Sequence, residues 1–417
     1  MFRDKNSFPS VKQPNPKLSS VYGYVIVAAS FLILLIAFGI NYSFGTFFND
    51  ILIDLDWTRA VTSAGYSISV FVGGAMGWIT GRLCDRFGPK ITILICGTLL
   101  ALGCLLMSQV YQTWQLYIYY GLLVGMGLGG TLIPLSSTVS RWFVRRRGLM
   151  TGIVSSGVGF GTIIVPIIAN QLLEVYDWRT SFVIIAVVVI IVILAAALFL
   201  KRDPSQIGQL AYGEFEPTII KSSAPETGVS FIQALRSGQF WIIFFIYVIF
   251  GFYLQSIMLH IVPYAKAIQI DADKAVTIMS FIGLGSIIGR IAMGGLSDRI
   301  GIKNSLLIAL GIMVLSFFWL LSSAVLWRLY LFSVFFGFAY GAMIALETLA
   351  GAKMFGLLSL GSIAGAFGFA YSLGGSIGPV VTGYIFDVTD SYNPAFLICT
   401  TLTVVALVLA FWLRKTR

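Results

Sequence analysis

Arg290 and Glu347 are two charged side chains that fall inside long apolar stretches of the sequence. An arginine guanidinium is a planar fork that suits a carboxylate held by two hydrogen bonds. If these stretches cross a membrane, an arginine at depth costs about 2.5–3.5 kcal/mol even on insertion scales. We therefore expect Arg290 to face a cavity and to anchor an anion. A structural pairing with Glu347 or with helix carbonyls is the alternative.

The chain has a single histidine, His260, in the segment HIVPY. An unperturbed imidazole titrates at about pH 6.5, which suits proton transfer at ordinary pH. His260 is therefore a candidate for proton coupling, with a hydrogen-bonded structural role as the alternative. Glu347 lies about three residues from the end of its apolar stretch, where Asp298, Arg299 and Lys353 are expected nearby. It is either a member of a charge cluster or a second candidate proton carrier.

The composition indicates which elements must position these residues. Of the 417 residues, 58% are hydrophobic and 11% are charged, about half the charged fraction of a soluble domain. A bilayer core about 30 Å thick needs about 20 apolar residues per helix. A β-barrel is excluded, because its strands would be about ten residues long with alternating polarity. We predict an all-α polytopic membrane protein with twelve helices at 22–48, 59–81, 91–110, 113–139, 149–172, 180–200, 239–263, 275–297, 304–323, 328–350, 358–385 and 394–413.

Positive charge is unevenly distributed between these twelve stretches. With the amino terminus inside, 21 Lys and Arg fall in inside segments and five in outside loops, a strong positive-inside bias. Both termini are therefore predicted to be cytoplasmic, in a plasma membrane or a bacterial inner membrane. The net charge of +10 is then a topology signal, and no nucleic-acid partner is expected. The four cysteines have no metal or redox spacing, and we expect no metal, no cofactor and no enzymatic activity.

The decapeptide GRLCDRFGPK at Gly81–Lys90 returns as GGLSDRIGIK at Gly294–Lys303, with six identical residues at an offset of 213. At the same offset Gly148, Gly152, Gly161 and Pro166 map to Gly361, Gly365, Gly374 and Pro379. Parallel repeats of this kind are a known transporter architecture. The predicted organisation is a tail at 1–20, a six-helix bundle at 21–200, a linker at 201–238, a second bundle at 239–413 and a tail at 414–417.

Each decapeptide lies at the turn between the second and third helix of its half. Its charged residues can pair with neighbouring helix ends, so we expect an inner gate made of Asp85, Arg86, Asp298 and Arg299. The pattern G-x-x-x-D-R-x-G-x-K resembles the inner-loop signature of the major facilitator superfamily, which implies alternating access by two bundles. The segment RWFVRRRGLMTGIVSSGVGFG at Arg141–Gly161 and the aromatic-Gly-aromatic start at Tyr22 look like those of monocarboxylate transporters and oxalate–formate-type exchangers.

Polar and aromatic side chains at suitable depths are further candidates for a substrate site: Tyr340, Tyr119, Tyr120, Tyr42, Tyr371 and Asn41. Arg290 precedes Asp298 by eight residues, roughly 12 Å along a helix, and Tyr340 should lie at a similar depth. Tyrosine hydroxyls can donate to a carboxylate and rings can line an organic tail, with packing as the alternative for each. Relatives of both branches are similar in placing an arginine of helix 8 against the substrate carboxylate. They also use aromatics on helices 4 and 10, which favours Tyr340 and one of Tyr119 and Tyr120.

The resemblance leaves two substrate classes open. Oxalate–formate exchangers have a second cation, a lysine on helix 11, but the aligned residue here is Gly374 and that helix has no Lys or Arg. One buried cation balances one carboxylate, which favours proton-coupled symport of lactate- or pyruvate-type monocarboxylates. Animal monocarboxylate transporters place an Asp one turn before the arginine and a Lys in helix 1, where this sequence has Ser286 and Tyr42. The proton therefore travels on His260 or Glu347, or with the substrate.

Two other functions remain as alternatives, an oxalate/formate-type anion exchanger and a transporter-like receptor that binds its ligand without moving it. The expected partners are a small organic monocarboxylate, a proton and membrane lipid, with a monomer as the functional unit.

Overall fold

The computed structural model describes residues 16–143, 146–209, 211–212, 228–322, 325–356 and 358–414. These residues are built into helices, and no named strand occurs among them. The first half consists of α1 (Pro16–Leu55), α2 (Arg59–Phe87), α3 (Pro89–Met107), α4 (Thr113–Leu116), η1 (Tyr117–Val124), α5 (Gly125–Gly129), α6 (Leu132–Trp142), α7 (Arg147–Val175) and α8 (Trp178–Leu198). The second half consists of α10 (Gly238–Ala267), α11 (Ala272–Ile300), α12 (Ile302–Leu321), α13 (Leu326–Phe355), α14 (Leu360–Thr389) and α15 (Asn393–Phe411). The short η2 (Pro204–Ile207) and α9 (Phe231–Leu235) lie between the halves.

Most of the two predicted tails and part of the predicted linker fall outside this description, because residues 1–15, 210, 213–227 and 415–417 are not among the described ones. The first helix begins at Pro16, six residues before its predicted start.

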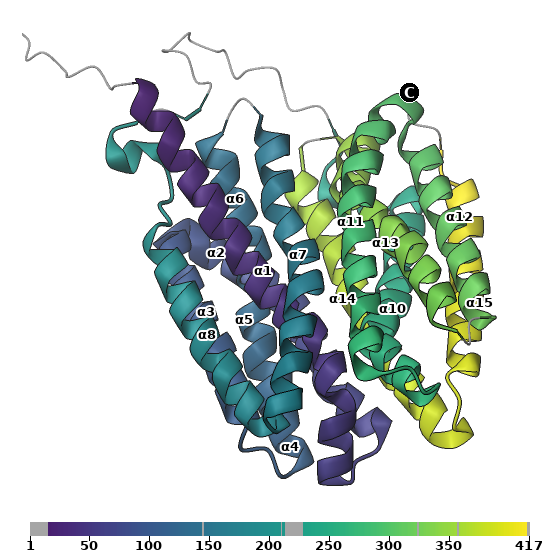
Figure 1. Ribbon diagram of the computed structural model, residues 1–417. Coiled ribbons are helices and arrows are strands. Elements are labelled where there is room, and N and C mark those ends of the chain that lie inside the picture. The colour runs from purple at the N-terminus through teal and green to yellow at the C-terminus, as the bar shows by residue number, and fades with distance from the viewer. Residues whose placement is uncertain are drawn as a thin grey trace, which may run out of the picture.

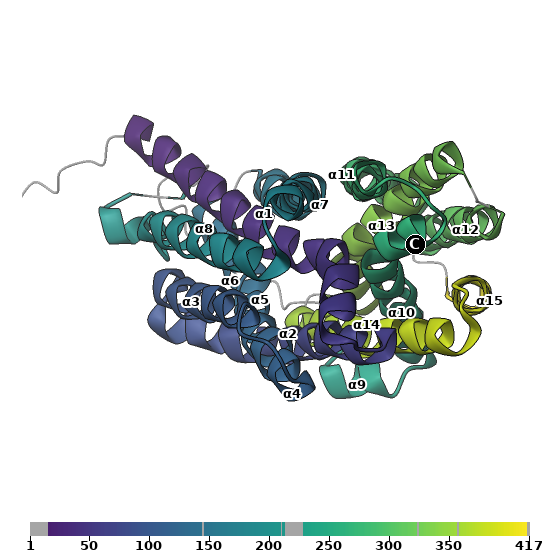
Figure 2. The same ribbon diagram turned by 60° about the horizontal axis from the view of Figure 1, so that its bottom comes forward.

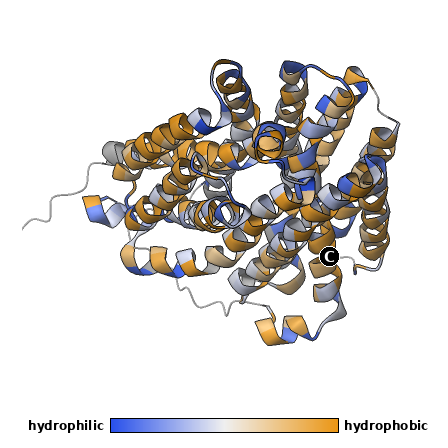
Figure 3. Ribbon diagram, turned by 90° about the horizontal axis from the view of Figure 1, so that it is seen from below, coloured by the Kyte–Doolittle hydropathy of each residue, from blue (hydrophilic) through white to orange (hydrophobic). Residues whose placement is uncertain are grey.

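Ten helical segments of the described chain are long and apolar enough to cross a membrane, which confirms the predicted all-α membrane fold. Large apolar side chains are exposed around them, including Ile191, Leu315 and Val388, and hydrophobic residues cover most of the ribbon in Figure 3. α2 and α14, with 29 and 30 residues, complete the twelve expected segments. They are less apolar because both are rich in glycine and serine, and they pack against each other.

The two halves repeat the same internal packing. In the first half α1 packs along α7 and α3 along α8, and in the second α10 packs along α14 and α12 along α15. Figure 1 shows the halves as two groups, purple to teal and green to yellow, and Figure 2 separates them again from a second direction. They meet along two main seams, α2 against α14 and α7 against α11, with α1 against α10 between them.

The chain ends define the two ends of the molecule. At one end the Tyr22 hydroxyl of α1 donates to the carbonyl of Phe199 after α8, at 2.9 Å. The Gln239 amide of α10 donates to the carbonyl of Trp412 after α15, at 3.4 Å. We call this the terminal end, and it lies at the top of Figure 1. The opposite end, where α1 ends and α2 begins, is the far end.

The seam between α7 and α11 is closed towards the far end and parted towards the terminal end. A Cβ on Gly283 would meet the carbonyl oxygen of Gly159 at 2.7 Å, so the two backbones touch there. Gly152 and Gly148 lie seven and eleven residues before Gly159, on the same face of α7. Neither has an atom within 4 Å of its Cβ position, nor has Gly294 of α11. The two helices therefore diverge towards the terminal end.

The seam between α2 and α14 behaves in the same way. Gly74 of α2 packs against the side chain of Ser372 of α14, and the Cβ position of Gly383 lies 2.9 Å from the Arg59 backbone at the far end. Gly365 and Gly361, seven and eleven residues before Ser372, face open space. Both seams thus part at the terminal end, and the halves are held together at the centre and at the far end.

This arrangement predicts which positions react with thiol reagents. Cysteines placed in Gly152→Cys and Gly365→Cys variants should react with maleimide quickly, whereas Ser63→Cys in the closed far-end seam should react slowly. Maleimide labelling of the wild-type protein should be low, because all four native cysteines are buried. Labelling rates in detergent measure this, and a Ser63→Cys variant that reacts as fast as Gly152→Cys would contradict the assigned conformation.

Candidate functional site

Arg290 lies on α11 at the point where the closed part of its seam ends. Its Nη1 donates to the carbonyl of Ser155 on α7 at 2.7 Å, and its Nη2 donates to the Tyr340 hydroxyl on α13 at 3.2 Å. Its Nε is buried and has no partner among the described residues. No ion pair joins Arg290 to an acid in the described chain. The site therefore has one uncompensated cation that contacts both halves and retains a free donor.

A group of hydroxyls continues from Arg290 into the interface. The Tyr42 hydroxyl on α1 lies 3.4 Å from the Tyr340 hydroxyl, and both side chains are buried. The ring of Phe250 packs beside Tyr340 and Tyr371, with centroid distances of 6.4 and 5.4 Å. The predicted site residues Tyr42, Tyr340 and Tyr371 thus come together from three different helices.

A second set of hydrogen bonds, beside these hydroxyls, crosses the interface between the two halves. The Tyr66 hydroxyl on α2 donates to Gln255 Oε1 on α10 at 2.7 Å, and Gln255 Nε2 donates to the Tyr371 hydroxyl at 2.6 Å. Asn41 Nδ2 donates to the Tyr66 hydroxyl at 3.4 Å, and Asn41 Oδ1 is buried without a partner. Because the single hydroxyl proton of Tyr66 goes to Gln255, the Asn41 group that faces it must be the NH₂. A free acceptor therefore remains on Asn41.

The fourth membrane-spanning segment contains Tyr119 and Tyr120, two adjacent tyrosines between which the sequence alone did not decide. The Tyr120 hydroxyl donates to the Asn41 carbonyl at 3.4 Å, and its ring lies 4.2 Å from Phe44, so Tyr120 faces the site. Tyr119 is only half-buried and packs against Trp114, with ring centroids 6.3 Å apart. Adjacent residues on a helix point about 100° apart, so only one of the pair can face the interface. The structure does not bring Tyr119 into the group.

Tyr66 and Gln255 are members of this group that sequence reasoning missed. Both lie in helices and carry a polar group that costs free energy when it is buried without a partner. Gln255 in the middle of an otherwise apolar stretch was the available signal. Tyr66 gave none, because a tyrosine in a serine-rich helix is as well explained by packing.

Glu347 lies on α13, nearer the terminal end than Tyr340. Its Oε1 is 3.4 Å from the Cβ position of Gly368 on α14. No hydrogen bond or ion pair joins it to another residue in the described ranges. Lys353, expected beside it, instead donates from Nζ to the carbonyl of Ser297 at 3.1 Å. Glu347 is therefore a half-buried carboxyl group without a described cationic partner.

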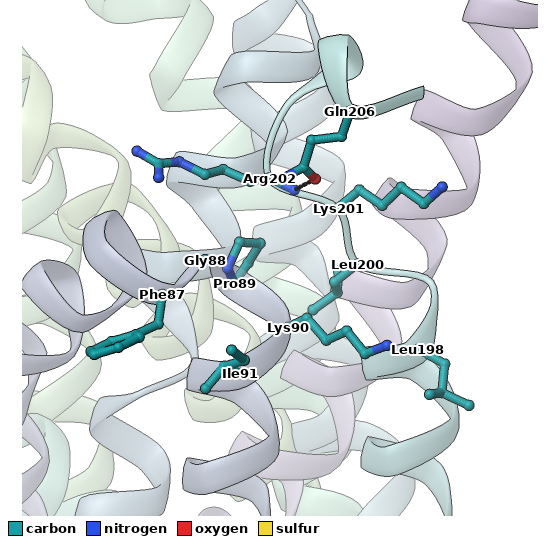
Figure 4. Close-up of a pocket in the computed structure, with 10 residues that line it drawn as sticks. All are labelled: Phe87, Gly88, Pro89, Lys90, Ile91, Leu198, Leu200, Lys201, Arg202 and Gln206. Carbon is teal, nitrogen blue, oxygen red and sulfur yellow. Dashed lines mark hydrogen bonds between the residues drawn. The ribbon is translucent and has the colours of Figure 1, made fainter. Parts of the chain in front are cut away.

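The expected inner gate lies at the terminal end, where the seams are parted. Arg86 and Arg299 are exposed, and the guanidinium of Arg86 lies 5.1 Å from the ring centroid of Phe87. The side chains of Asp85 and Asp298 lie outside the described residues. A cavity of about 390 Å³ opens nearby, lined by Phe87, Lys90, Lys201 and Arg202 among others. Figure 4 shows the charged ends of Lys201 and Arg202 pointing apart, so they do not converge on a ligand.

His260 is fully buried in the closed far-end seam. Its Nε2 lies 2.9 Å from the carbonyl oxygen of Pro379 and 3.2 Å from the hydroxyl of Ser63, and its Nδ1 lies 3.3 Å from the Tyr392 hydroxyl. Since a carbonyl oxygen can only accept, Nε2 carries a proton, and the contacts fit the neutral imidazole. His260 thus shares no partner with Arg290, and its ring nitrogens are satisfied by neutral groups.

Asp387 at the end of α14 closes the far end by capping a helix of the other half. Its carboxylate accepts hydrogen bonds from the backbone N–H groups of Arg59 and Ala60, at 2.9 and 2.8 Å. These are the first two residues of α2, where free N–H groups and the helix dipole favour a negative charge. The interaction exists only while the far end is closed.

Comparison with known proteins gives the family of this architecture. The model of the Major Facilitator Superfamily matches residues 29–379. Human monocarboxylate transporter 12 is 26% identical over 91% of this chain and 78% of its own length. Human monocarboxylate transporter 7 is 23% identical over 91% of this chain and 83% of its own length.

Solved structures share the fold at lower identity. The nucleoside transporter NupG superposes with a TM-score of 0.74 at 16% identity, over 94% of this chain and all of that chain. A bacterial homologue of the human lysosomal transporter Spinster superposes with a TM-score of 0.71 at 16% identity, over 94% of this chain and 96% of that chain.

Removing the cap at α2 should loosen the far end. Loss of an N-cap carboxylate costs about 1 kcal/mol, so Asp387→Ala should raise the fraction of molecules open at the far end about fivefold. The readout is maleimide labelling of Ser63→Cys in the Asp387→Ala background. Asp387→Asn keeps one of the two acceptor oxygens and should therefore raise the labelling rate less than Asp387→Ala does. Equal labelling with and without Asp387 would refute the clamp.

Proposed function

Because this chain belongs to the major facilitator superfamily, we propose that it carries small monocarboxylates of the lactate and pyruvate type across a membrane together with a proton. The observation that supports this most directly is Arg290, a cation in the interface between the halves with no described acidic partner. A carboxylate is the ligand that such a guanidinium fork suits best. Relatives that carry the name monocarboxylate transporter agree with that choice.

The site offers donors and an acceptor that suit a small hydroxy acid. The buried Nε of Arg290 is a free donor for a carboxylate oxygen, and the Tyr340 hydroxyl beside it can turn to the same group. The free Oδ1 of Asn41 can accept from a substrate hydroxyl. The Tyr66–Gln255–Tyr371 branch lies on the far side and limits how long the substrate tail can be.

A second cation for a dicarboxylate has no room at the position aligned with the lysine of oxalate–formate exchangers. The backbone of Gly374 packs directly on the carbonyl of Val248 on α10, so a longer side chain there would displace one of the two helices. Two carboxylates beside Arg290 alone would leave one buried charge unpaired. This favours monocarboxylate transport over the exchange of oxalate-like diacids.

We propose that the described conformation is open to the cytoplasm. The positive-inside distribution assigns the terminal end to the cytoplasm, and that is the end at which both seams are parted. Arg290 then lies at the bottom of the opening and tethers α11 to α7 through Ser155. A bound carboxylate neutralises the guanidinium, which lowers the cost of burying it when the terminal end closes and the far end opens.

Proton coupling is assigned to Glu347 in preference to His260. Glu347 lies on the open side of Tyr340 and has no described cation to hold it ionised, so a proton can neutralise it. His260 in this conformation keeps three neutral partners and is closed off from both sides. Binding of one proton and one carboxylate adds no net charge to the interface. The two halves can then change conformation without burying an additional charge.

Substitution of Arg290 should weaken substrate binding strongly. Hydrogen bonds to a charged group contribute about 1.5–3 kcal/mol, so Arg290→Gln should weaken L-lactate binding by roughly tenfold to a hundredfold. Tyr340→Phe removes one donor and should weaken it by only a few-fold. Calorimetric titration of the purified protein measures both, with Arg86→Gln as the control at an exposed arginine. Unchanged affinity in Arg290→Gln would sink the proposed role of this residue.

Neutralising Glu347 should separate exchange from accumulation. Glu347→Gln resembles the protonated side chain, so lactate–lactate exchange should persist while accumulation driven by a proton gradient is lost. His260→Gln should keep accumulation. Counterflow and gradient-driven uptake in proteoliposomes distinguish the two activities, and the reverse pattern would move the proton to His260.

A further inference from the structure

Arg59 is a cation in the far-end seam, held by neutral groups. Its Nη1 donates to the Tyr392 hydroxyl at 2.9 Å and to Asn49 Oδ1 at 3.3 Å. Its guanidinium carbon lies 4.1 Å from the ring centroid of Phe386 and 5.9 Å from that of Phe48. Aromatic faces attract a cation but leave its charge uncompensated.

The nearest acid does not pair with the guanidinium. The Asp387 carboxylate is engaged by the backbone N–H groups of Arg59 and Ala60, and no ion pair joins the Arg59 side chain to an acid within the described ranges. Two other far-end cations do have acidic partners. Arg179 lies 3.0 Å from Asp54, and Lys274 lies 2.7 Å from Asp271 and keeps the pKa of that carboxyl below its usual value.

The neutral partners of Arg59 come from both halves. Phe386 and Tyr392 belong to the second half, and Asn49 and Phe48 belong to α1 of the first half. When the far end opens, the second-half partners must leave, and Arg59 keeps Asn49. The guanidinium then lies at the entrance of the opened seam. It is also at the N-terminus of α2, which is the positive end of the helix dipole.

The face of α2 below Arg59 leads to the central site. Ser63 and Tyr66 follow four and seven residues later on the same helix face. Ser63 contacts His260, and Tyr66 contacts Gln255, which in turn contacts Tyr371. A carboxylate attracted to Arg59 would therefore enter a polar path that ends at the hydroxyls around Arg290.

We propose that Arg59 is an outer anion site, which captures the substrate carboxylate when the far end is open and releases it towards the central site as the aromatic partners return. The inference rests on the proposed transport of monocarboxylates. Phe386 and Tyr392 replace the anion in the closed state, so closure itself expels the carboxylate from Arg59. The contacts with Tyr392 and Phe386 also hold the closed state, and what favours anion capture is that the charge of Arg59 has no acidic partner in the described chain.

Uptake of external L-lactate by cells that express the chain tests this, because the far end faces outward in the proposed topology. Arg59→Gln should raise the KM about tenfold, the loss expected for one charged hydrogen bond, and leave kcat within about twofold. The KM of the wild type should rise with ionic strength, and the KM of Arg59→Gln should rise less, since screening acts on the charge that was removed. Arg59→Lys should retain most of the wild-type KM, because capture needs the charge more than the fork.

Two controls separate capture from closure. Arg328→Gln removes a half-buried far-end cation whose side-chain contacts, with Ser322 and Trp327, lie in its own half, and it should leave KM unchanged. Asp387→Ala loosens the clamp without removing the charge and should not raise KM. If Arg59→Gln lowers kcat at unchanged KM, Arg59 is a latch and the inference is overturned. If the wild type takes up no monocarboxylate, the proposed function fails and this inference fails with it.

Discussion

An arginine that has no counter-ion among the described residues of an apolar interface is the constraint on which the rest of this structure depends. Arg290 costs free energy wherever it is buried, and the protein reduces that cost with a carbonyl of one half and a hydroxyl of the other. The bond to Ser155 ties the two halves together at the level where the seams begin to part. An anion that binds the guanidinium therefore affects both halves at once. Alternating access requires such coupling between substrate binding and the movement of the halves.

The internal repeat explains why this charge stands out. The scaffold is symmetric: the same helix pairs pack in each half, and both seams part over glycines spaced seven and eleven residues from their last contact. The repeat mate of Arg290 is Gly77, and that of Ser155 is Gly368, beside which Glu347 lies. One seam thus has a cation, Arg290, where the repeat has Gly77, and the other has an acid, Glu347, where the repeat has Pro134. The charged residues of the site are positions at which the two halves differ. The residues that the halves share build the two helix bundles that move.

Much of this was predictable from the sequence, for identifiable reasons. Long apolar stretches and a decapeptide repeated at an offset of 213 determine the helices and their order, and a buried arginine among them marks the interface. Depth counting predicted that Tyr340 lies at the level of Arg290, because a rise of 1.5 Å per residue holds in regular helices. The direction in which each side chain points was harder to predict. The π-helical turn at Tyr117–Val124 decides between Tyr119 and Tyr120, and the capping of α2 by Asp387 involves backbone groups that no side-chain pattern reveals.

The most direct test of the proposed mechanism is uptake of labelled L-lactate into proteoliposomes, with and without an inward proton gradient. Uptake that rises with the gradient and collapses when a protonophore is added is the expected result, because one proton and one carboxylate must load together beside Arg290 and Glu347. Uptake that ignores the gradient but responds to internal oxalate or formate would contradict proton-coupled monocarboxylate transport. It would assign the interface to anion exchange.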